Sequence, residues 1–237
     1  MRRAWNALVT IVTGLAVLVA ALWLVRDPRS PLPDAWNPLT PFDLTAPITP
    51  WTPMKLRRAT ADPKRCLAAL DPHADVQSLP PLVGTGGCGI NPRVALSRAG
   101  QTTLARVETT CAIALRLAAW ERFVVQPAAQ AHLGASVDRI RHQSSYNCRP
   151  IRTANGPGQR PSTHATAEAI DIAGVVLSNG RRLELVGNWA DPSPEALFFR
   201  ALHDGACDWF VTVLGPDYNA LHADHFHMQS VGWGACR

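Results

Sequence analysis

The first apolar segment of the chain runs from Asn6 to Val25 and contains no charged residue. Twenty residues of helix span about 30 Å, the thickness of the hydrocarbon layer of a bilayer. Arg2 and Arg3 precede the segment, so the positive-inside rule predicts a cytoplasmic N-terminus and an exported remainder. The alternative is a cleaved signal peptide that ends near Val19-Ala20-Ala21. The length of the segment favours a retained single-pass anchor in the cytoplasmic membrane, residues 1–26, with residues 6–25 in the bilayer.

Proline dominates the pattern that follows, with eight prolines in residues 27–53. Each proline fixes φ and removes a hydrogen-bond donor, which excludes a long helix or a central strand there. This composition predicts an extended linker between the membrane and a domain over residues 54–237. The domain is long enough to bury a core of its own.

Helical periodicity is clearest between Val107 and Val125, where apolar residues recur three or four positions apart. We expect the main amphipathic helix there, interrupted at Pro127 and continued by a shorter helix that ends at Gly134. A short helix is expected at residues 66–70, and residues 84–89 form a glycine-rich loop. Ser193 and Pro194 start another helix, which should end at about Gly205.

Strand-like segments dominate the second half of the domain. They lie at residues 137–140, 169–173, 175–177, 209–214 and from 226 onward, and residues 153–163 are expected to form a loop. Asn179-Gly180 is a strong signal for a two-residue hairpin, with residues 181–185 as the returning strand. The pattern predicts an α+β fold in which helices pack on a small antiparallel sheet.

Six cysteines, none in a Cys-x-x-Cys pair, are typical of disulfides in an exported chain. Fifteen connectivities are possible. Short separation favours the sequential pairing Cys66–Cys88, Cys111–Cys148 and Cys207–Cys236.

The net charge of +5 is spread along the chain, without a lysine-rich block interleaved with aromatic residues. This pattern, together with export, argues against nucleic acid as a partner. A mildly basic surface is compatible with an anionic polymer such as a cell wall.

Potential metal ligands and acid-base groups are most concentrated near the C-terminus, where the segment 222–227 holds three histidines and Asp224. Upstream, His164 and Asp171 supply another imidazole and another carboxylate. These are the ligand types that zinc accepts, and a catalytic zinc takes three protein ligands with one open position. On a strand His225 and His227 point to the same face, so either could be the third ligand. The two segments together predict a zinc site.

The segment Ser162-x-His164-x-x-Ala167-x-Ala169-x-Asp171, followed by Asp224-x-x-His227, resembles the zinc signature of D-alanyl-D-alanine carboxypeptidases and L-alanyl-D-glutamate endopeptidases. More closely, Cys148-Arg149, Ser162-x-His164, Ala169-Ile-Asp171, Asn219-Ala-Leu-His222 and Asp224-His-Phe-His227 resemble the bacterial extensin-like C-terminal domain family, over roughly residues 60–237.

The resemblance implies roles for six residues. His164, Asp171 and His227 would be the zinc ligands, and Asp224 would be the catalytic acid-base group. Arg149 would stabilise the oxyanion and His225 would line the pocket. Two positions depart from the peptidase pattern: Ala167 replaces a usual glycine, and Asp224 replaces a commoner glutamate.

These roles predict an exported zinc metallopeptidase that hydrolyses peptidoglycan peptides, either cross-links or stems. Two rival hypotheses remain. The domain could bind the cell wall without catalysis and keep a structural or vestigial zinc site. It could also be a metal-independent structural domain held by its disulfides.

Overall fold

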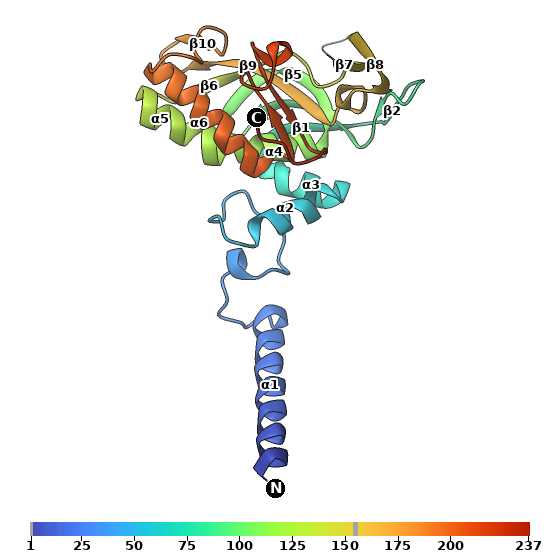
Figure 1. Cartoon of the computed structure of the whole chain (residues 1–237), viewed down its shortest axis with the longest axis vertical. Coiled ribbons are helices and arrows are strands. Elements are labelled where there is room, and N and C mark those ends of the chain that lie inside the picture. Colours follow the sequence, from blue (N-terminus) through green and yellow to red (C-terminus); the bar gives the residue numbers. More distant parts are fainter. Residues whose placement is uncertain (1, 154–155) are drawn as a thin grey trace. The chain divides into compact units, whose positions relative to one another are not determined.

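The computed structural model describes residues 2–153 and 156–237, which form two compact units (Figure 1). The first unit ends at Arg58 and the second covers residues 59–237. The helices of the first unit are α1 Arg2–Arg26, the 3₁₀ turn η1 Asp34–Trp36 and α2 Thr52–Thr60, whose last two residues belong to the second unit.

Helix α1 covers the whole apolar segment, and it is long and apolar enough to cross a membrane. The proline-rich segment after it is not an extended chain. The Nζ atom of Lys55 donates to the Asp34 carbonyl at 2.5 Å and to Thr40 Oγ1 at 2.8 Å, and the Asn37 side chain donates to the Val25 carbonyl at 3.0 Å. These bonds fold the segment on itself, a possibility that proline content alone does not reveal.

The second unit is an α+β structure with a larger sheet than the sequence predicted. Its helices are α3 Pro63–Leu70, η2 Asp71–His73, α4 Cys111–Trp120, the π-helical turn η3 Glu121–Val125, α5 Gln126–Leu133, η4 Thr163–Thr166, α6 Pro194–Trp209 and η5 Ala220–His222. Its strands are β1 Ala74–Leu79, β2 Leu82–Val83, β3 Gly89–Ile90, β4 Arg93–Ala99, β5 Thr102–Thr110, β6 Val137–His142, β7 Pro150–Thr153, β8 Gly156–Pro161, β9 Ala169–Leu177, β10 Arg182–Glu184, β11 Thr212–Leu214 and β12 Phe226–Gln229.

The main sheet has eight strands in the order β1-β4-β5-β6-β9-β12-β11, with β10 paired to β9. All its pairs are antiparallel except β5 with β6. Helices α4 and α6 pack against each other and against strands of this sheet (Figure 1). Buried aromatic side chains fill the space around α6, and the Trp120 indole donates to the Leu202 carbonyl at 3.0 Å.

The predicted main helix starts four residues later than expected. Residues 107–110 belong to β5, where Val107 lies opposite Leu96, and Thr110 then caps α4 by accepting from the Ile113 amide. Val107 and Cys111 lie four positions apart, as in a helical repeat, although one belongs to β5 and the other to α4. Pro127 does not interrupt the helix as predicted. The π-helical turn η3 leads directly into α5, and Pro127 lies in the first turn of α5. Gly134 ends α5 in a left-handed conformation, as predicted.

Three further boundaries differ from the prediction. Helix α6 continues past Gly205 to Trp209, so the strand expected from residue 209 begins at Thr212. The expected loop at 153–163 contains most of a two-stranded ribbon, β7 and β8, although residues 154–155 lie outside the described residues. The hairpin at Asn179-Gly180 is confirmed by the pairing of β9 with β10.

The sequential disulfide pairing is correct for one bridge of three. Cys207–Cys236 is present, with its Cα atoms 5.8 Å apart. The others are Cys66–Cys111, with a Cα separation of 6.2 Å, and Cys88–Cys148, with 5.5 Å. Helix α3 packs on α4, which brings Cys66 to the first residue of α4. Tertiary packing, rather than proximity in the sequence, therefore decides these two pairs.

Candidate metal centre

His164 lies in the short turn η4, where its side chain is buried. Ser162 caps this turn, and its hydroxyl accepts from the His164 amide at 3.3 Å. The His164 Nδ1 atom lies 2.9 Å from the Ser145 carbonyl, which can only accept. Nδ1 therefore carries the proton, and Nε2 presents a lone pair. A backbone carbonyl that fixes the tautomer in this way is a common support of metal-binding histidines.

Asp171 and His227 face each other on neighbouring strands. They are register partners in the antiparallel pair β9–β12, and His227 Nδ1 lies 2.8 Å from Asp171 Oδ1. His164 Nε2 lies 3.1 Å from His227 Nδ1 and 3.1 Å from Asp171 Oδ2. Potential ligand atoms from η4, β9 and β12 thus lie close together: one nitrogen of each histidine and the two carboxylate oxygens of Asp171.

This donor set fits a zinc ion. Tetrahedral ligands at about 2.0–2.1 Å from zinc lie roughly 3.4 Å from one another, close to the distances between these atoms. The lone pair of His164 Nε2 also faces a carboxylate oxygen of Asp171. Such an arrangement is repulsive unless a proton or a cation lies between the two atoms. The electrostatics of the site therefore favour a bound cation, and so does its geometry.

The charge states of these residues also suit ligation. Burial by itself would raise the pKa of Asp171, but the neighbouring imidazole rings of His164 and His227 lower it well below its usual range. Burial lowers the pKa of His227, although Asp171 opposes this effect. A buried carboxylate next to neutral imidazole is the protonation state that metal binding requires.

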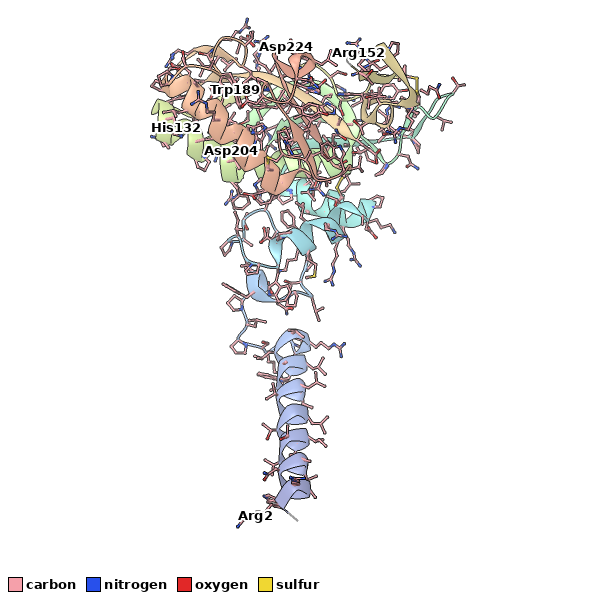
Figure 2. The ribbon with its side chains drawn as sticks, in the orientation of Figure 1. Arg2, His132, Arg152, Trp189, Asp204 and Asp224 are labelled. Carbon is pink, nitrogen blue, oxygen red and sulfur yellow. A yellow bond between two sulfur atoms is a disulfide. The ribbon has the colours of Figure 1, made fainter. Side chains whose placement is uncertain are left out.

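Asp224 reaches the centre through His225. Its Oδ1 atom lies 2.8 Å from Nδ1 of His225, whose Nε2 lies 3.6 Å from Asp171 Oδ1. The Asp224 side chain is 57% exposed, on the loop before β12 at the top of the view in Figure 2. The hydrogen bond with His225 lowers its pKa. The sequence singled out Asp224 and His225, but not Gln143, whose amide donates to Asp224 Oδ2 at 3.4 Å.

His222 joins His225 and His227 in a cluster of three rings to which the sequence assigned no separate role. Its ring centroid lies 5.4 Å from that of His225 and 5.6 Å from that of His227. Its Nδ1 atom lies 2.8 Å from Asn219 Oδ1. Burial, together with the neighbouring histidines, lowers the pKa of His222 to about 4, which keeps the ring neutral at physiological pH.

Arg149 feels the charge of Asp171 but makes no described hydrogen bond to His164, Asp171 or His227. Its guanidinium donates to the Pro150 carbonyl at 3.3 Å. Burial and the neighbouring Arg152 lower its pKa, while the Asp171 carboxylate raises it, so Arg149 lies within electrostatic reach of Asp171. Arg152 is labelled on β7 in Figure 2. The Cys88–Cys148 disulfide holds the backbone immediately before Arg149.

The buried hydroxyl groups of Ser145 and Thr109 form a pair next to the centre that the sequence did not predict. Ser145 Oγ donates to the Ala169 carbonyl at 2.6 Å and lies 2.7 Å from Thr109 Oγ1. The same serine supplies the carbonyl that orients His164. The segment 143–145 therefore ties the turn of His164 to the strand of Asp171, although nothing in its composition marks it as functional.

Ala167 explains one departure from the peptidase pattern. Its φ is +51°, in the left-handed region that favours glycine. The Ala167 carbonyl accepts from the Thr110 amide at 3.4 Å and from Thr110 Oγ1 at 3.3 Å. The turn between His164 and Asp171 thus needs a left-handed residue, and this chain meets the need with alanine.

The family model described as "Extensin-like protein C-terminus" matches residues 64–237. This match includes every residue of the centre. No curated protein and no solved structure matches the chain.

Proposed function

The chain belongs to the extensin-like protein C-terminus family, and we propose that its domain is an exported, membrane-anchored zinc hydrolase that cleaves peptidoglycan peptides. The observation that carries the proposal is the convergence of His164, Asp171 and His227, with potential ligand atoms 2.8–3.1 Å apart. The carbonyl that fixes the tautomer of His164 supports metal binding further.

Two features support the proposed location. Helix α1 is long and apolar enough to anchor the chain in the cytoplasmic membrane. Three disulfides in the second unit suit an oxidising, extracytoplasmic compartment. A domain outside the membrane would then meet the cell wall, and the resemblance of the ligand spacing to that of peptidoglycan peptidases motivates the choice of substrate.

A zinc ion at this centre would supply Lewis-acid chemistry, which polarises a peptide carbonyl and acidifies water. Asp224 and His225 would handle the proton. The Asp224 carboxylate accepts a proton from the attacking water, directly or through His225, and returns it to the leaving amine. Hydrogen bonding between Asp224 and His225 holds the Asp224 carboxylate beside the ring whose Nε2 lies 3.6 Å from Asp171 Oδ1.

Arg149 would supply positive charge where negative charge develops on the carbonyl oxygen. The disulfide at Cys148 restrains the backbone of this residue, and the Asn147 amide donates to the His164 carbonyl at 2.9 Å. The segment that carries Arg149 is therefore fixed to the same turn that carries His164. This attachment suits a residue that must keep its position relative to the metal ligands.

One observation favours a second candidate, a wall-binding domain with a structural zinc. The Asp224 carboxylate is already hydrogen-bonded to both His225 and Gln143. These bonds could hold it in place as part of a binding surface instead of leaving it free to exchange protons. Both candidates require the metal, and only the hydrolase requires Asp224 to take part in turnover.

Digestion of muropeptides by the full-length chain in detergent tests the proposal. We expect new amino groups and shorter peptides with zinc, and loss of both after removal of the metal by a chelator. Restoration by added zinc would exclude damage by the chelator. Zinc binding without cleavage of any peptide bond in cross-linked or uncross-linked muropeptides would reject the hydrolase and favour the wall-binding domain.

A further inference from the structure

The imidazole cluster of His222, His225 and His227 offers a second set of ligand atoms. One ligand atom from each ring lies within 4.8 Å of the others, as is also true of His164, Asp171 and His227. The two sets share only His227. His222 lies in η5 and His225 immediately precedes β12, so the second set comes from the C-terminal segment alone.

Hydrogen bonds prepare both unshared rings of this cluster to bind a cation. His222 Nδ1 lies 2.8 Å from Asn219 Oδ1, and His225 Nδ1 lies 2.8 Å from Asp224 Oδ1. Both partners are oxygen acceptors, so each Nδ1 carries the proton and each Nε2 presents a lone pair. A carboxylate or amide oxygen behind a histidine is the outer-shell arrangement that fixes the tautomer of metal ligands.

The described contacts of the shared ring engage one of its two nitrogens. His227 meets His164 and Asp171 through Nδ1, and none of the described hydrogen bonds engages Nε2. The second set contains no carboxylate, and two of its three rings are only partly buried, so it should hold a cation less tightly than the first set does.

From this geometry we infer that His222, His225 and His227 form a second, lower-affinity zinc site that inhibits the enzyme. The inhibitory role rests on the proposed hydrolase function, whereas the site itself does not. His225 Nε2 lies 3.6 Å from Asp171 Oδ1, so a cation on this nitrogen is adjacent to the first centre. It also occupies the Nε2 lone pair with which His225 would accept a proton from water before passing one to Asp224 from Nδ1.

Zinc stoichiometry of the full-length chain in detergent tests the site without reference to activity. Equilibrium dialysis against buffered free zinc should give two zinc ions per wild-type chain, the second at higher free zinc. His222→Gln should bind one. The matched control His132→Gln, a histidine on α5 outside both sets, should bind two. Circular dichroism checks that each variant is folded, and His225→Gln, which should also bind one, replaces His222→Gln if that variant unfolds.

Inhibition is measured as the rate of each protein at high zinc divided by its own rate at low zinc. Loss of acid-base assistance is worth on the order of 100-fold, so we expect a fall of that size in the wild type and in His132→Gln, but not in His222→Gln. One zinc per wild-type chain at saturation, or two in folded His222→Gln and His225→Gln, would overturn the site. Equal inhibition of His222→Gln and wild type would overturn its inhibitory role. Two zinc ions without cleavage at any zinc level would reject the hydrolase and leave the second site standing.

Discussion

Asp171 and His227 lie directly opposite each other on β9 and β12, with Oδ1 and Nδ1 2.8 Å apart. The two residues are 56 positions apart in the sequence, so the sheet register alone aligns them. Because side chains alternate between the faces of a strand, a slip of one residue would turn one of them to the other face. The candidate centre is therefore only as well defined as the pairing of these two strands.

Substitutions at His227 and Asp224 should separate metal binding from turnover. His227→Ala removes a potential ligand and should abolish high-affinity zinc binding, as measured by equilibrium dialysis. Asp224→Asn keeps the shape of the side chain but removes its basicity. This variant should bind zinc normally and lose about 10²–10⁴-fold in the rate of muropeptide cleavage, the usual range for acid-base catalysis. Full activity of Asp224→Asn would refute the proposed role of Asp224.

The left-handed turn at Ala167 predicts that two substitutions there will differ in their effect on stability. Ala167→Gly relieves a backbone cost of roughly 1–2 kcal/mol, but it loses a buried methyl group and adds freedom to the unfolded chain. These effects nearly cancel, so stability should change by less than about 1 kcal/mol. Ala167→Val places a β-branched residue at φ +51° in a fully buried position and should cost about 2 kcal/mol or more.

Urea denaturation of the full-length chain in detergent measures both changes, and zinc affinity gives an independent readout. We expect Ala167→Gly to retain zinc binding and Ala167→Val to weaken it, because the turn joins His164 to Asp171. If valine were tolerated as well as glycine, the left-handed conformation of this residue would not be required for the turn.

The sequence predicts the fold best where local patterns decide the outcome. The hairpin at Asn179-Gly180 and the start of α6 after Ser193 follow from turn and capping chemistry. The strand β5 was hidden because Val107 and Cys111 lie four residues apart across its junction with α4. The parallel pairing of β5 with β6 leaves no local signal at all.

The candidate centre divides in the same way. His164, Asp171 and His227 are recognisable because their spacing resembles a known signature. Ser145 and Gln143 are not, since their contribution depends on where a short polar segment lies in the folded domain. The disulfides Cys66–Cys111 and Cys88–Cys148 were mispaired for the same reason.

The Cys88–Cys148 bridge should contribute both to stability and to function. In the chain-entropy model, a bridge between cysteines 60 residues apart stabilises by about 4 kcal/mol, so the double variant Cys88→Ser/Cys148→Ser should lose about that much. The variant should also cleave muropeptides more slowly, because the backbone next to Arg149 is released. Zinc stoichiometry should remain unchanged, since neither cysteine is a ligand.

The double variant Cys207→Ser/Cys236→Ser is the control for this loss. Its cysteines lie 29 residues apart, and the same model gives about 3–4 kcal/mol. We expect a similar loss of stability, measured by urea denaturation, with a smaller loss of activity at a temperature where both variants are folded. Equal losses of activity in the two double variants would mean that the Cys88–Cys148 bridge does not support activity by restraining the backbone at Arg149.

Gly205 tests why α6 does not end where the sequence predicted. A methyl group added at this position would overlap with the side chain of Val124 in the π-helical turn η3. Glycine therefore permits close packing here, although it costs about 1 kcal/mol of helix propensity relative to alanine. Gly205→Ala should still lower stability by about 1–2 kcal/mol, because overpacking outweighs the gain in propensity.

Shortening the opposing side chain should reverse the effect. In the double variant Gly205→Ala/Val124→Ala the overlap is removed. Its loss of unfolding free energy should therefore be smaller than the summed losses of the two single variants by about 1 kcal/mol or more. Gly14→Ala is the control, since a methyl group at that helical glycine meets no atom within 4 Å and should leave the unfolding of the second unit unchanged. Strictly additive single and double variants would show that Val124 does not restrict residue 205, and α6 would then need another reason to continue through a glycine.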